Sequence, residues 1–95
     1  MIRSFSDSRT RRLFEDDRRR GFGGLDYERA LLLLDALDAA PSLESLRVLQ
    51  AVRLHALTGD RKGRYAMTVN HRWRITFRFA DGDGHDVAVE DYHRG

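Results

Sequence analysis

Apolar residues follow two different patterns along the chain, one helical and one strand-like. Between residues 26 and 39 they recur every three or four positions, a spacing that places side chains on one face of a helix. Asp26 is a favoured N-cap residue, and Pro41 ends the segment because the residue before a proline avoids the helical region. The spacing therefore predicts a helix over 26–39, with an apolar stripe formed by Tyr27, Ala30, Leu31, Leu34 and Leu37.

The segment before that helix carries more charge and has fewer apolar positions. Residues 1–5 predict a short strand. Serine and aspartate side chains then offer N-cap oxygens for a first helix over about 7–19, anchored by Leu13 and Phe14. The glycine-rich stretch 21–24 ends this helix.

From residue 52 onward, apolar and polar residues alternate, as in strands that bury one face. The sequence Asp-Gly-Asp-Gly at 81–84 indicates a tight hairpin. The predicted order is β-α-α-β-β-β-β, an α+β fold in which two helices cover one face of a small twisted sheet and leave the other face open and polar. The predicted strands of this half are 52–57, 64–69, 73–79 and 85–92.

Length and composition restrict the class of protein. Ninety-five residues allow one domain, spanning 1–95. Cysteine is absent, which excludes disulfides and thiolate metal sites. No apolar run approaches the roughly 18 residues that a membrane span requires, and the N-terminal residues lack the apolar core of a signal peptide. We therefore expect a single-domain cytoplasmic protein with no membrane association.

Positive charge is concentrated in part of the chain although the net charge is only +2. Residues 51–79 hold seven basic residues and one acidic residue. Sixteen of the 17 basic residues are arginine, whose planar guanidinium binds phosphates through two parallel hydrogen bonds. Such a focused patch favours a polyanionic partner, while a simply solvated surface is the alternative.

Four separated stretches form a recognisable set: Leu-His-Ala-Leu-Thr-Gly-Asp-Arg-Lys-Gly at 54–63, Trp-Arg-Ile-Thr-Phe at 73–77, Glu-Asp-Tyr-His at 90–93, and the opening Met-Ile-Arg-Ser-Phe followed by Leu13-Phe14. Together they resemble HigB-type toxins. HigB proteins are the toxin half of HigBA toxin–antitoxin systems, within the RelE/ParE superfamily. The resemblance covers nearly the whole chain, and the four stretches occur in the family's order.

The resemblance implies an endoribonuclease that cuts messenger RNA in the ribosomal A site and thereby stops translation. It also implies contacts with ribosomal RNA, inhibition by a HigA-type helix-turn-helix antitoxin, and binding of operator DNA only through the antitoxin complex. No cofactor is expected. The histidines and acidic residues show no spacing typical of metal ligands, so no metal site is expected either.

Metal-independent RNA cleavage requires a base for the 2′-hydroxyl, a cation for the phosphorane and an acid for the leaving 5′-oxygen. With the resemblance, these needs point to His55, Arg74, Asp91, Tyr92 and His93 as the catalytic residues. His55 or Asp91 is the base, Arg74 holds the phosphate and His93 is the acid.

Three cations in and directly after the 58–63 loop are predicted to contact the messenger or ribosomal RNA backbone: Arg61, Lys62 and Arg64. The chain departs from the family pattern at Thr58, where ribosome-dependent members often carry a lysine. Loss of that cation weakens phosphate binding unless Arg61 or Lys62 compensates.

Each candidate also has a structural interpretation. His55 can be an edge-strand histidine bonded to backbone, and His93 a residue of a frayed terminus. Asp91 can pair with an arginine, and Arg74 can form a surface ion pair with Glu90. Tyr92 can be a partly buried core residue.

Two other functions remain open for a chain of this kind. One is a ParE-like toxin that binds DNA gyrase and needs no acid–base residues. The other is a non-catalytic member that acts only with the antitoxin in repressing its promoter, which the substitution at Thr58 keeps possible.

Overall fold

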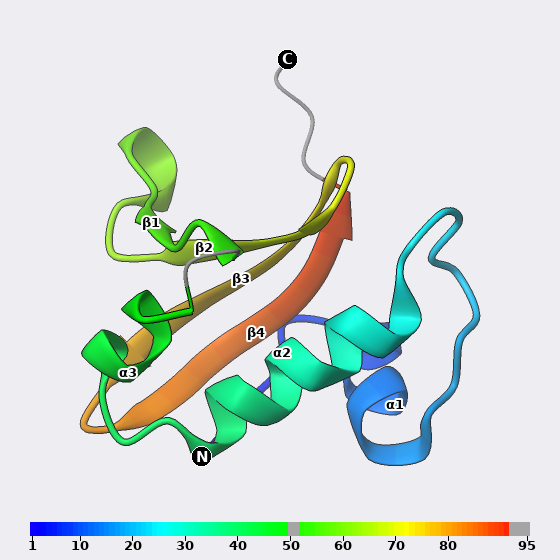
Figure 1. Cartoon of the computed structure of the whole chain (residues 1–95), viewed down its shortest axis with the longest axis horizontal. Coiled ribbons are helices and arrows are strands. Elements are labelled where there is room, and N and C mark those ends of the chain that lie inside the picture. Colours follow the sequence, from blue (N-terminus) through cyan, green and yellow to red (C-terminus); the bar gives the residue numbers. More distant parts are fainter. Residues whose placement is uncertain (50–51, 92–95) are drawn as a thin grey trace.

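The computed structural model describes residues 1–49 and 52–91, and these form an α+β fold. The elements in chain order are α1 (Ser8–Asp16), α2 (Tyr27–Ala39), α3 (Leu43–Arg47), β1 (His55–Ala56), the 3-10 helix η2 (Gly59–Arg61), β2 (Tyr65–Asn70), β3 (Trp73–Ala80) and β4 (Asp83–Asp91). The four strands form one antiparallel sheet in the order β1-β2-β3-β4 (Figure 1). The predicted fold class is confirmed.

The N-terminal segment lies along the outer edge of β4 and runs parallel to it. Bridges join Ile2 to Gly84 and Phe5 to Val87. The Arg3 amide donates to the Gly84 carbonyl at 2.8 Å, and the Val87 amide donates to the Ser4 carbonyl at 3.1 Å. The predicted strand at 1–5 is therefore present as two isolated bridges that satisfy the backbone of β4.

Helix α1 is shorter than the predicted 7–19. Asp7 caps its start, since the carboxylate accepts from the Thr10 amide at 2.7 Å. Its end is set by Asp17, which adopts a left-handed conformation (φ 52°) and whose amide donates to the Leu13 carbonyl. The glycine-rich stretch 21–24 was expected to end the helix. The helix ends earlier, at an aspartate in a left-handed conformation that residues other than glycine adopt infrequently. Arg18, Arg19 and Arg20 therefore lie in a loop.

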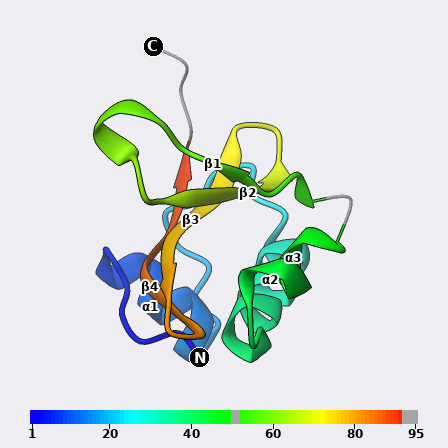
Figure 2. The ribbon, with the colours of Figure 1, turned by 90° about the vertical axis from the view of Figure 1, so that its left-hand side faces the viewer.

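Helix α2 agrees with its prediction and packs closely on the sheet. The Asp26 carboxylate accepts from the Arg29 amide at 3.1 Å, as an N-cap does. Figure 2 shows α2 and α3 on the same side of the sheet. At Gly84 on β4, an added Cβ would lie 3.3 Å from the Leu37 side chain, so this glycine permits the close approach of α2.

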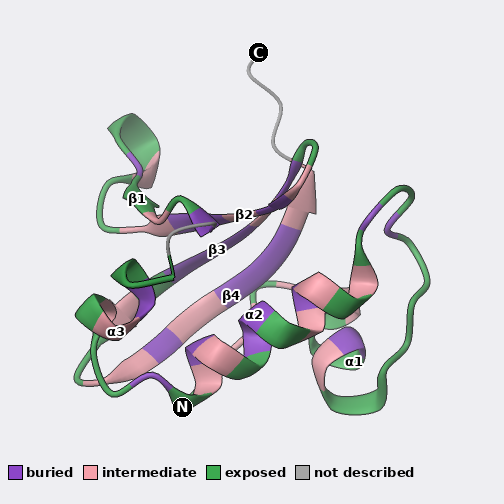
Figure 3. Ribbon diagram, viewed as in Figure 1, coloured by how far each residue is buried: buried purple, intermediate pink, exposed green. Residues whose placement is uncertain are grey.

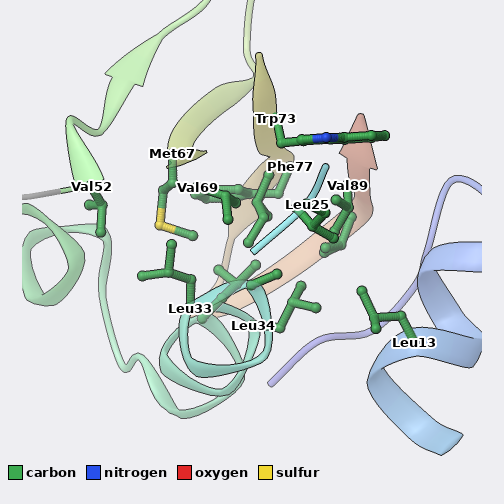
Figure 4. Close-up of a cluster of buried hydrophobic side chains, with 14 of the residues drawn as sticks. Leu13, Leu25, Leu33, Leu34, Val52, Met67, Val69, Trp73, Phe77 and Val89 are labelled. Atoms are coloured by element: carbon green, nitrogen blue, oxygen red, sulfur yellow. The ribbon is translucent and has the colours of Figure 1, made fainter. Parts of the chain in front are cut away.

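The core fills the space between α1, α2 and the inner face of the sheet. Figure 4 shows Leu13 of α1 and Leu34 of α2 pointing toward one another beneath the strands. Both are fully buried, as are Phe77 and Val89, and Figure 3 shows burial continuing along β3 and β4. These residues bury the apolar surface that stabilises the fold.

The prediction of a strand over 52–57 was wrong in extent, because only His55 and Ala56 pair with β2. Arg53 has φ 52°, a left-handed conformation that interrupts an extended chain before His55. The ladder ends where the Leu57 amide donates to the Arg64 carbonyl at 2.8 Å. Strand β4 in contrast begins earlier than the predicted 85, and the end of the predicted strand at Tyr92 lies outside the described residues.

The hydroxyl of Thr10 is predicted to stabilise the junction of α1 with β4. Thr10 is fully buried, and its Oγ1 accepts from the Val89 amide at 3.0 Å. Thr10→Val keeps the side-chain shape but leaves that amide unpaired, so we expect a loss of about 1–3 kcal/mol in the free energy of unfolding, measured by urea denaturation. Thr10→Ser retains the hydroxyl and should lose less. Equal stability of wild type and Thr10→Val would contradict the assignment.

Candidate active site

Strand register places the candidate chemistry on the face of the sheet opposite the core. His55 pairs with Ala66, and Ala66 with Thr76, so these residues share one side. Arg74 pairs with Glu90 two residues further along and shares the same side. Met67, Ile75 and Val89 point the other way and are buried in the core. The face predicted to be open and polar therefore carries His55, Arg74, Thr76 and Glu90. It is open only in part, because Ala66 and Thr76 are fully buried on this side.

His55 is exposed, and its hydrogen bond defines which ring nitrogen carries the proton. The Nδ1 atom lies 2.9 Å from the Arg53 carbonyl oxygen. A carbonyl only accepts, so Nδ1 carries the hydrogen, and in the neutral ring the lone pair is on Nε2. The left-handed backbone of Arg53 turns its carbonyl toward the imidazole. The structure thus bonds His55 to backbone and still leaves Nε2 able to accept a proton.

Arg61 forms the most extensive polar contact on this face. Its Nη1 and Nη2 atoms lie 2.7 and 2.8 Å from the two oxygens of Glu90, a bidentate ion pair. The Thr76 hydroxyl also donates to Glu90, and Arg61 Nη2 lies 3.4 Å from Thr76 Oγ1. These contacts hold the end of η2 over Thr76 of β3 and over Glu90, near the C-terminal end of β4.

The guanidinium of Arg61 is the main cause that lowers the pKa of Glu90, and the Thr76 hydroxyl adds to the effect against the opposing influence of burial. Glu90 is consequently ionised near neutral pH and does not serve as a proton donor there. Its ion pair holds the Arg61 guanidinium in place.

Arg74 is half-buried, and its side chain lies along the start of β3. Its Nη1 donates to the carbonyls of His71 and Trp73 at 2.7 and 3.0 Å. Glu90, the carboxylate opposite it in the register, binds Arg61. Arg74 therefore presents a fixed cation at the edge of the open face, two residues along β3 from Thr76.

Asp91 forms an ion pair with Arg72, at 3.3 Å between the carboxylate and Nε. The structural interpretation of Asp91, an ion pair with an arginine, therefore agrees with the structure. Asp91 pairs with Trp73 in the register, so strand alternation directs it away from the side of Arg74 and Glu90. Tyr92 and His93 lie outside the described residues.

The other two loop cations differ in their surroundings. Lys62 is exposed, and within residues 1–49 and 52–91 its side chain has no ion pair or hydrogen bond, although its amide donates to the Gly59 carbonyl. Arg64 lies 3.8 Å from Asp86, which also accepts from Arg78 at 2.7 Å. Arg78 is the chief cause that lowers the pKa of Asp86. Lys62 therefore fits the predicted contact with an RNA backbone more directly than Arg64.

Two groups of the site were not identified from the sequence. Thr76 and Glu90 were not among the predicted site residues, and Arg61 was expected to bind RNA instead of a carboxylate. Both lie in stretches that resemble the family, 73–77 and 90–93, and Glu90 was considered only as a partner of Arg74. The Arg61–Glu90 contact joins residues 29 apart in the chain, so no local pattern indicated it.

No group of histidine and acidic side chains among the described residues is arranged to hold a metal ion. None of the helices in that part of the chain is long and apolar enough to cross a membrane.

Comparison with known proteins gives a consistent result. Residues 3–93 match the family model described as HigB-like toxin, the RelE-like toxin of the type II toxin–antitoxin system HigB. The chain is 40% identical over 93 residues to Endoribonuclease HigB of Proteus vulgaris, covering 98% of this chain and 100% of that protein. It is 34% identical to Toxin HigB-1 of Vibrio cholerae serotype O1, covering 97% and 94%. This chain belongs to the HigB family of RelE-like toxins from type II toxin–antitoxin systems.

Proposed function

We propose that this protein is an endoribonuclease toxin that cuts messenger RNA in the ribosomal A site and blocks translation, without a metal or cofactor. The observation that carries the proposal is the sheet face opposite the core, where a histidine with an available Nε2 shares one side with the guanidinium groups of Arg61 and Arg74. The similarity to a relative named as an endoribonuclease supports it. Action on ribosomes places the protein in the cytoplasm.

In the proposed reaction, Nε2 of His55 takes the proton of the 2′-hydroxyl, and the 2′-oxygen attacks the adjacent phosphorus. The bond from phosphorus to the 5′-oxygen breaks, leaving a 2′,3′-cyclic phosphate and a 5′-hydroxyl. Arg74 stabilises the charge of the phosphorane, and His93 gives the leaving 5′-oxygen its proton. Asp91, bound to Arg72, orients the end of β4, and Tyr92 stacks on a base of the RNA.

Arg61 is proposed to supply the cation that Thr58 lacks. Both residues belong to the same short turn, with Thr58 immediately before η2 and Arg61 at its end. The ion pair with Glu90 fixes the Arg61 guanidinium above Thr76, on the side of His55. The approach of a phosphate would let Arg61 exchange one carboxylate oxygen for a phosphate oxygen. Lys62 and Arg64 would contact the RNA backbone beyond the cleaved bond.

The proposed partner is a HigA-type helix-turn-helix antitoxin that neutralises the toxin, and operator DNA would be bound only through that complex. Family membership supports an antitoxin partner, because these toxins belong to two-component systems.

Cleavage is expected to require ribosomes and both proposed acid–base histidines. In primer extension on a defined messenger RNA, wild type should cut only with programmed ribosomes. His55→Ala and His93→Ala should each lower the single-turnover rate by about 10²–10⁴-fold. His71→Asn is the matched control, since His71 is exposed in a turn with φ 47°, a conformation that asparagine adopts readily.

Undiminished cleavage by the His55→Ala/His93→Ala double variant would exclude the proposed roles. Absence of cleavage by wild type, with or without ribosomes, would instead favour the gyrase-binding toxin or the non-catalytic antitoxin partner.

Compensation by Arg61 predicts coupling between positions 58 and 61. Arg61→Ala should lower the single-turnover rate by about 10²-fold, the usual effect of losing one group that stabilises the transition state. Thr58→Lys should raise the rate, and in that background the loss from Arg61→Ala should shrink. Additive effects of the two substitutions in this double-mutant cycle would show that Arg61 does not replace the lysine.

The Arg61–Glu90 pair is also expected to make stability depend on pH. The pKa of Glu90 is below its ordinary value of 4.5, so the pair stabilises the fold above about pH 4.5 and loses this contribution as pH falls through the folded-state pKa. Between pH 6 and pH 3, the thermal midpoint of Glu90→Gln should fall less than that of wild type. Glu44→Gln, at an exposed position of α3, should follow wild type. Parallel curves for Glu90→Gln and wild type would contradict the assignment.

A further inference from the structure

A second cationic feature lies apart from the open face of the sheet. A pocket of about 460 Å³ is formed between α1 and the loop that follows it. All five of its lining residues are arginines: Arg9, Arg12, Arg18, Arg19 and Arg20. Figure 1 shows this loop beside α1 and the N-terminal end of α2. None of these arginines belongs to the candidate active site.

Arg9 forms the fixed base of the pocket. Its Nη1 donates to the Gly21 carbonyl at 2.5 Å, and its Nη2 donates to the Val89 carbonyl at 3.4 Å. The guanidinium carbon lies 4.6 Å from the centre of the Phe22 ring and 5.8 Å from that of Trp73. Arg9 therefore joins the loop to β4 and shields both aromatic rings from the pocket.

The loop itself is anchored at several points. The Tyr27 hydroxyl lies 2.6 Å from the Arg19 carbonyl and 3.0 Å from that of Phe22. The Trp73 indole nitrogen donates to the Gly23 carbonyl at 2.9 Å, and Phe22 is almost fully buried. These contacts hold the backbone that carries the arginines in place, so the pocket is a built part of the fold.

Among the described residues, one of the five pocket arginines forms an ion pair with a carboxylate. Arg19 pairs with Asp17 at 2.9 Å. Within the described part of the chain, Arg12, Arg18 and Arg20 form no ion pair. Like charges held close together on an anchored backbone repel one another and destabilise the protein when no ligand is bound. An anionic ligand would offset that repulsion.

The chemistry of the lining defines the ligand further. Guanidinium groups donate hydrogen bonds and accept none, so the ligand must present acceptors. The lining includes no aromatic face on which a base could stack, and no amide or carboxylate that could recognise one. Several adjacent guanidiniums instead match phosphate groups, each of which accepts two parallel hydrogen bonds from an arginine.

We propose that this pocket binds consecutive phosphates of an RNA backbone, independently of base sequence. The inference rests on the proposed function and extends it, since the bond from Arg9 to Val89 places the pocket two residues from Asp91 on β4. An RNA strand bound at the end of β4 then continues into the pocket, which holds the strand without taking part in the bond-breaking step.

The test measures binding without cleavage. The probe is a fluorescent single-stranded RNA whose 2′-O-methyl groups prevent attack on phosphorus, and anisotropy gives its Kd over a range of salt concentrations. Arg12→Gln/Arg20→Gln should weaken binding about tenfold and reduce the slope of log K against log salt by about 1.4, as expected for two lost contacts to a single strand. Arg11→Gln/Arg47→Gln is the charge-matched control, since both residues are exposed, lie outside the pocket lining and pair with nearby glutamates.

The proposal is supported if the control variant keeps the wild-type affinity and salt dependence while the pocket variant loses both. An equal loss in both variants would overturn it, because net charge would then explain the effect, and so would a lack of RNA binding by wild type. If tripolyphosphate binds at the pocket but does not change the Kd for RNA, the ligand of the pocket would be a small polyphosphate instead of RNA. If polyglutamate of matched charge displaces the RNA, the ligand of the pocket would be an acidic protein.

Because no cleavage is measured, these outcomes are independent of whether ribosome-dependent cutting occurs.

Discussion

Strand β4 is the last strand of the sheet, and other parts of the chain form hydrogen bonds with the backbone amides and carbonyls of its outer edge. The rest of the structure depends on these bonds. Residues 1–6 pair with its first half, and the Thr10 hydroxyl and the Arg9 guanidinium bond to the amide and carbonyl of Val89. An unpaired edge of this length would leave backbone groups unsatisfied and would invite pairing with another chain. The same arrangement fixes where Glu90 and Asp91 lie, so the candidate site depends on the N-terminal segment although none of its residues comes from there.

The arginines of this chain fall into two classes with different physical roles. Several are paired with carboxylates, as Arg61 is with Glu90 and Arg78 with Asp86, and these pairs position loops and strands. Others converge with fewer acids than cations among the described residues, as around the pocket beside α1, where Arg19 alone pairs with a carboxylate. Local charge balance therefore separates arginines that organise the fold from arginines suited to an external polyanion, a distinction that the net charge of +2 conceals.

Sequence patterns predicted the helices and the main strands well where local chemistry determines structure. Asp26 and Pro41 bound α2 as expected, and the Asp-Gly turn at 81–82 joins β3 to β4. The predictions failed where backbone conformation departs from residue preference. Asp17 and Arg53 adopt left-handed conformations without being glycine, and these two residues shorten α1 and β1. Predictions at Tyr92 and His93 concern positions outside the described residues.

The sequence by itself determined the fold class, the order of the two long helices and the four strands of the sheet, and the family, because periodicity, capping and motif order are local properties. Only the tertiary structure decided which charges meet. Arg61 binds Glu90 instead of remaining solvated, and Arg9 joins α1 to β4 from a distance of 80 residues along the chain. Such contacts depend on strand register and loop conformation, which set the distances between side chains and which no local pattern in the sequence encodes.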